Sequence, residues 1–128
     1  MSPRTASPAA LFDPDGAMSH FIPGVEPAKG ETKIVKSLPN AFAKTELDAV
    51  LKATGRNNLI VVGFMTHMCI SATTRAATDL GYRATVVAGA TATRDLPDGS
   101  GGIIGAATVH RVALAELGDR FATVVPYL

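Results

Sequence analysis

The chain has 128 residues, the size of one domain, and it is 47% hydrophobic and 18% charged, so a packed core is expected and disorder is not. The net charge of +1 gives no reason to expect nucleic acid or an anionic membrane as a partner. The apolar stretches are too short to cross a bilayer, the N-terminus lacks the apolar core of a secretory signal, and the single cysteine excludes an intrachain disulfide, so we expect a cytoplasmic protein.

Five of the eight prolines lie in the first quarter of the chain, together with three glycines. This pattern predicts one domain over residues 1–128, in which an irregular arm (1–32) precedes an α/β core (33–128). The core is predicted to begin with a short strand at 33–36.

Strand and helix patterns then alternate along the core. A helix is predicted from its N-cap Thr45 to its stop at Gly55. It is followed by strand 58–63, helix 68–80, strand 83–88, loop 89–102, helix 103–117 and strand 121–125. This order predicts right-handed βαβ units, and therefore an α/β fold with a doubly wound, Rossmann-like parallel sheet and helices on both faces.

Two reactive side chains are expected at one edge of this sheet. Ligands of open parallel sheets bind outside the carboxyl ends of the strands. Cys69 follows strand 58–63 where a helix begins, and Lys36 ends strand 33–36. A helix N-terminus and a nearby ammonium both favour a thiolate, and the unpaired N–H groups can stabilise an oxyanion. On position alone, an inert buried cysteine remains an equal alternative.

Three sequence elements of the core occur in a specific order and spacing. They are K-x-x-x-x-A-F at 36–42, G-x-x-T-x-x-C at 63–69, and the pairs Ala76-Ala77 and Gly81-Tyr82. With these elements, residues 33–125 resemble the isochorismatase-like cysteine hydrolase family, which includes nicotinamidases, carbamoylsarcosine amidases and isochorismatases.

The resemblance implies a role for several residues. Cys69 corresponds to the nucleophile that forms a covalent adduct with the substrate carbonyl carbon, and Lys36 to the active-site lysine that supports the thiolate. The Phe64–Met65 peptide falls where the family has a cis bond, which places the oxyanion hole at the backbone N–H groups of Met65 and Cys69. Family members that act as isochorismatases lack the cysteine, so its presence favours hydrolysis of an amide or carboxamide.

Several further residues have both a functional and a structural interpretation. Phe42, His67 and Met68 are candidates for the wall of a substrate pocket, although a structural histidine and a core methionine are common alternatives. His20 has no evident partners for a metal site, and His110 is expected on a helix, at the surface or in packing. We therefore expect no metal and no cofactor.

The family's acid-base aspartate, which follows a first core strand, has no counterpart that we assign. Asp13 and Asp15 lie in a Pro/Gly-rich context that does not match a strand end. The chain thus resembles a family member that is N-terminally truncated, without the first strand and helix. Strand 58–63 would then have an unpaired edge and an uncovered apolar face, so we expect a homodimer or a higher homo-oligomer.

Three hypotheses from different classes follow. The first is a hydrolase that acts on a small amide-type substrate through Cys69. The alternative is a catalytically impaired family member or interaction subunit that lacks the acid-base aspartate. A nucleotide-binding module is disfavoured, because no tight glycine-rich turn joins a strand to a helix.

Overall fold

The structure is a computed structural model that describes residues 27–128. The chain forms two units, Met1–Lys33 and Ile34–Leu128. In the described part of the first unit, the N–H of Glu31 donates a hydrogen bond to the carbonyl oxygen of Ala28 (3.0 Å). The sequence predictions about Asp13, Asp15 and His20 lie outside the described residues.

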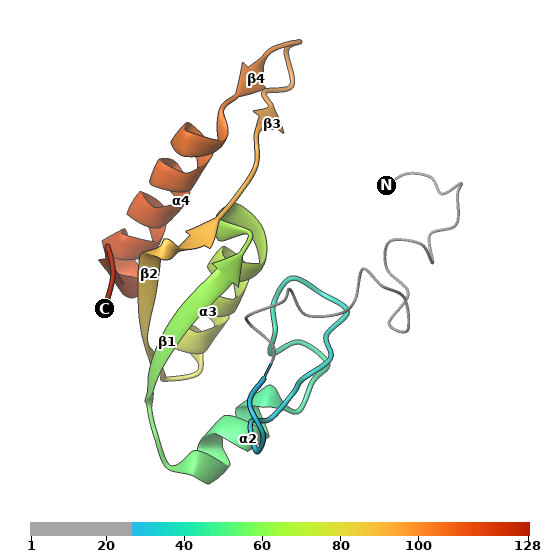
Figure 1. Cartoon of the computed structure of the whole chain (residues 1–128), viewed down its shortest axis with the longest axis vertical. Coiled ribbons are helices and arrows are strands. Elements are labelled where there is room, and N and C mark those ends of the chain that lie inside the picture. The colour runs from blue at the N-terminus through green and yellow to red at the C-terminus, as the bar shows by residue number, and fades with distance from the viewer. Residues whose placement is uncertain (1–26) are drawn as a thin grey trace, which may run out of the picture. The chain divides into compact units, whose positions relative to one another are not determined.

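The second unit holds all the helices and strands of the described residues. They are α2 (Leu47–Thr54), β1 (Asn58–Phe64), the π-helical turn η2 (Thr66–Ile70), α3 (Ser71–Asp79), β2 (Arg83–Ala92), β3 (Leu96–Pro97), β4 (Ile103–Ile104), α4 (Ala106–Arg120) and β5 (Ala122–Val125) (Figure 1). A parallel sheet has the order β1-β2-β5, and β3 pairs with β4 in a small antiparallel ribbon. The predicted α/β fold with a parallel sheet is therefore confirmed.

One face of the sheet carries the core. The strand register places Val61, Val86 and Val124 next to one another, and Ile70 of η2 and Leu117 of α4 pack against this row. Both crossovers run in the same direction across the sheet, and right-handed crossovers of that kind place their helices on the same face. For this reason α3 and α4 contact each other and share one side of the sheet.

The other face is open along β1. Ile60, Val62 and Phe64 alternate along this strand with 59%, 53% and 56% of their surface exposed. β1 is also one of the two edge strands of this sheet within residues 27–128. The expected unpaired edge and uncovered apolar face are thus present in the described chain, where the two helices that cover the sheet lie on one face only.

Two predicted elements near Lys36 differ from the structure. Residues 33–36 form no strand and pair with none of the described strands. α2 begins at Leu47 after the N-cap Glu46, one residue later than the predicted cap; the hydroxyl of Thr45 still accepts the N–H of Leu47 (3.2 Å). The helix ends at Gly55, which has the left-handed conformation that the sequence predicts (φ +73°).

Two later boundaries also move. β2 continues to Ala92, four residues beyond the predicted end, because its last part pairs with the end of β1 after a register shift. α4 starts at Ala106 instead of 103, because Ile103 and Ile104 pair with β3. None of the helices in the described part of the chain combines the length and apolar character that a membrane crossing requires.

Candidate active site at the β1–η2 corner

The corner between β1 and η2 presents the cysteine. The Phe64–Met65 peptide bond is cis, as the family resemblance implies, and it follows Gly63, whose φ of +123° suits glycine. The carbonyl oxygen of Met65 accepts the N–H groups of Met68 (3.0 Å) and Ile70 (3.2 Å), which closes the turn. Cys69 lies in this turn with its side chain partly exposed.

Lys36 reaches this corner from a segment that has no regular secondary structure. Its Nζ donates hydrogen bonds to Sγ of Cys69 (3.2 Å) and to the carbonyl oxygen of Leu38 (3.1 Å). The two reactive side chains expected from the sequence therefore meet, although the strand expected to carry Lys36 is absent.

The segment that carries Lys36, residues 36–48, runs along α3. The hydroxyl of Thr73 accepts the N–H of Ala41 (2.9 Å) and donates to the carbonyl oxygen of Pro39 (3.2 Å). The ring of Phe42 stacks on Tyr82, with 5.8 Å between the ring centroids. We call residues 36–48 the lysine segment.

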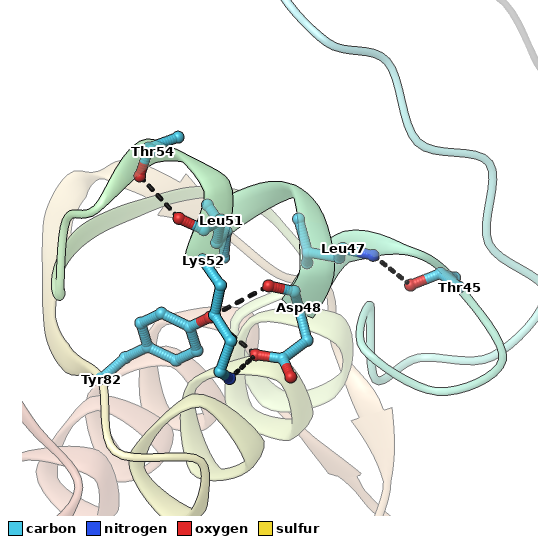
Figure 2. A network of polar contacts seen from close by, with 7 residues as sticks. All are labelled: Thr45, Leu47, Asp48, Leu51, Lys52, Thr54 and Tyr82. Atoms are coloured by element: carbon cyan, nitrogen blue, oxygen red, sulfur yellow. Dashed lines mark hydrogen bonds and ion pairs between the residues drawn. The ribbon is translucent and has the colours of Figure 1, made fainter.

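A polar network joins the end of the lysine segment to Tyr82 (Figure 2). The hydroxyl of Tyr82 donates to Oδ1 of Asp48 (2.6 Å), and Lys52 forms an ion pair with the same carboxylate. The hydrogen bond from Lys52, followed by that from Tyr82, lowers the pKa of Asp48 below its ordinary value. The same carboxylate raises the pKa of Lys52 and that of Tyr82.

Two histidines tie the corner to neighbouring elements. Nδ1 of His67 shares a hydrogen bond with the hydroxyl of Thr93 beyond β2 (2.6 Å). Nδ1 of His110, on α4, shares one with the hydroxyl of Thr66 (2.9 Å), and Thr66 is completely buried. Of the two alternatives for His110, surface or packing, the structure shows packing, with Thr66 as its partner. The sequence did not predict this partner, because residues 66 and 110 are far apart along the chain.

The environment of the cysteine is cationic within residues 27–128. No carboxylate of this part of the chain forms a hydrogen bond or ion pair with Cys69 or Lys36, since the ion pairs there involve Lys52 and Arg75. Nor do three or more His, Cys, Asp or Glu side chains gather there in a way that could hold a metal ion. The described geometry supplies a nucleophile and its cation, without a carboxylate beside them.

Comparison with known proteins finds a family model that matches almost the whole chain. The model of the isochorismatase domain matches residues 1–126, so the match includes the N-terminal segment, beyond the resemblance over 33–125. The crystal structure of an isochorismatase from Pseudomonas putida KT2440 is 49% identical and superimposes with a TM-score of 0.85, covering 90% of this chain and 59% of that one.

Two further similar proteins extend the comparison. An uncharacterised isochorismatase family protein of Bacillus subtilis, YddQ, is 40% identical over 116 residues, which are 91% of this chain and 64% of the relative. The nicotinamidase of Staphylococcus aureus is 27% identical with a TM-score of 0.62, covering 74% of this chain and 53% of that one. The chain spans slightly less than two thirds of the length of curated relatives that it matches.

Proposed function

Because the chain belongs to the isochorismatase family, we propose that it is a cysteine hydrolase that acts on a small amide or carboxamide through a covalent adduct on Cys69. The observation that carries the proposal is the 3.2 Å contact between Nζ of Lys36 and Sγ of Cys69 at the carboxyl end of β1. The amide class is supported by the similarity to a structure named as a nicotinamidase.

In the proposed reaction, the thiolate of Cys69 attacks the carbonyl carbon of the amide. A carbon–sulfur bond forms, and the electron pair of the carbonyl π bond moves to oxygen. As the family resemblance implies, we assign the oxyanion hole to the backbone N–H groups of Met65 and Cys69, which lie on either side of the start of the η2 turn. Collapse of the intermediate breaks the carbon–nitrogen bond and leaves a thioester, which water hydrolyses to return the thiolate.

The step that lacks a described participant is proton transfer. The leaving nitrogen must gain a proton, and the attacking water must lose one. Lys36 already donates to Sγ of Cys69 and to the carbonyl oxygen of Leu38, and a lysine ammonium is a poor acid near neutral pH unless it is desolvated. General acid-base catalysis contributes about 10²–10⁴-fold. We therefore expect slow turnover and accumulation of the thioester, and the alternative function is a catalytically impaired family member or interaction subunit.

The test is a carboxamide panel that includes nicotinamide, with ammonia release and intact-protein mass measured together. A mass increase equal to the acyl group, absent in Cys69→Ala, supports the covalent mechanism. Slow or undetectable ammonia release together with that adduct supports the expectation of slow turnover for want of a proton carrier. Turnover of about 10 s⁻¹ contradicts this expectation. Ammonia release that persists in Cys69→Ala contradicts the nucleophilic role of Cys69.

We also propose that Phe42, His67 and Met68 border the substrate. His67 and Met68 belong to the same turn as Cys69, and both are partly exposed. His67 is oriented by its hydrogen bond to Thr93, and Phe42 by its stacking on Tyr82. Met68→Ala should change KM across the panel more than it changes the rate of alkylation of Cys69. If the variant has the same KM as the wild type for every amide, this placement is wrong.

The open edge of β1 supports association of the chain with copies of itself. Unpaired backbone groups and exposed apolar side chains favour pairing with another strand. Val62→Lys should weaken association in sedimentation equilibrium, whereas Val112→Lys, at a position of α4 with the same 53% exposure, should not. A wild-type chain that remains a stable monomer at micromolar concentration contradicts the proposal.

A cytoplasmic location, proposed from the single free cysteine, is testable by cell fractionation.

A further inference from the structure

We propose that Thr73 and Tyr82 are positioning residues that hold the lysine segment along α3 and so keep Lys36 against Cys69. This inference rests on the proposed function, because it concerns how the Lys36–Cys69 pair is maintained. Neither residue touches the reacting atoms, and each acts through the segment that carries Lys36.

The pair needs such support because Lys36 is held by little else. Lys36 is exposed, and residues 31–36 have no regular secondary structure. A long lysine side chain loses considerable rotamer freedom when it is fixed in one geometry, so an exposed ion pair forms poorly unless the backbone beneath it is held. The contact at 3.2 Å therefore requires an anchor close to Lys36 in the chain.

Thr73 is the nearest anchor. Its hydroxyl donates to the carbonyl oxygen of Pro39 and accepts the N–H of Ala41, so one side chain fixes two backbone positions that follow Lys36 by three and five residues. Thr73 itself follows Cys69 by one helical turn, which is a rise of about 6 Å. The helix thus sets the distance between the anchor of the segment and the sulfur that Lys36 must reach.

Tyr82 anchors the other end of the segment. It lies just beyond α3, is 5% exposed, and stacks its ring on Phe42. Its hydroxyl donates to the carboxylate of Asp48 (2.6 Å) and lies 3.3 Å from the carbonyl oxygen of the same residue. The lysine segment therefore contacts η2, α3 and the turn after α3 at one point each, at Cys69, Thr73 and Tyr82, in the same order along both segments.

The experiment measures the rate of alkylation of Cys69 by iodoacetamide at about pH 7, divided by the rate at about pH 9.5. The rate at the higher pH corrects for access to the sulfur, so the ratio reports how far the fold favours the thiolate. Thr73→Val, which removes the hydroxyl at constant size, should lower the ratio by about two- to threefold, and Thr73→Ser should restore it. Tyr82→Phe should lower the ratio less, because stacking on Phe42 remains.

Two controls separate positioning from general stability. Thr78→Val removes a hydroxyl of the same helix that donates to the carbonyl oxygen of Phe121 (2.6 Å), away from the lysine segment, and it should leave the ratio unchanged. In a Lys36→Met background, Thr73→Val should cause no further loss.

The outcomes distinguish the inference from the function on which it rests. If Thr73→Val leaves the ratio at the wild-type value, or if Thr78→Val lowers it equally, the positioning role is wrong even if Cys69 is activated. If the wild-type ratio equals that of a free thiol and Lys36→Met does not change it, the proposed activation of Cys69 by Lys36 is wrong.

Discussion

Replacement of Lys36 by methionine tests the chemistry of the site most directly. The substitution keeps most of the length of the side chain and removes the ammonium that donates to Sγ of Cys69 at 3.2 Å. Because Lys36 is exposed, solvent screens the pair, and a water-like dielectric gives an attraction of about 1 kcal/mol at this distance. That free energy corresponds to about a fivefold loss in the rate at which Cys69 is alkylated near neutral pH.

The assay is the same ratio of alkylation rates at about pH 7 and about pH 9.5. Lys36→Met should lower the ratio about fivefold, whereas Lys44→Met should leave it unchanged. Lys44 is a matched control because it is also exposed, lies in the same segment and removes the same charge. An unchanged ratio in Lys36→Met would show that the contact does not influence the protonation of the sulfur, and an equal loss in Lys44→Met would show that net charge alone is responsible.

Three predictions concern stability, each measured by urea denaturation. Leu117→Ala, at a fully buried core position, should cost about 2–5 kcal/mol, while Val112→Ala on the exposed side of α4 should cost little. Gly89→Ala should cost about 1–3 kcal/mol, because the added Cβ would lie 2.7 Å from the carbonyl oxygen of Pro126. The fold lowers the pKa of Asp48, so its contribution is present above about pH 4 and lost as the pH falls; Asp48→Asn should therefore reduce the acid sensitivity of the protein. Wild-type stability in Leu117→Ala or in Gly89→Ala, or an unchanged pH profile in Asp48→Asn, would contradict these contacts.

The parallel sheet could be predicted because its strands leave a strong local pattern. Residues 58–64 and 83–92 are rich in β-branched side chains and are separated by a helix of ordinary length, so local chain properties identify them. Residues 33–36 have a similar but shorter pattern, and a strand exists only where a neighbour pairs with it. Residues 33–36 pair with none of the described strands, although the edge of β1 is open, and local sequence cannot reveal this.

The site divides in the same way between local and tertiary information. Cys69 could be placed at a strand–helix corner from sequence, because the strand and the helix are both local features. The hydrogen bond between Thr66 and His110, and the anchors at Thr73 and Tyr82, join residues between 32 and 44 positions apart, for which sequence patterns carry no signal. Their chemistry is nevertheless consistent, since each one fixes backbone around a reactive side chain by pairing a hydroxyl with a partner from another element. A surface ion pair is weak by itself, and for this reason we propose that such hydroxyl contacts hold the exposed lysine against the cysteine.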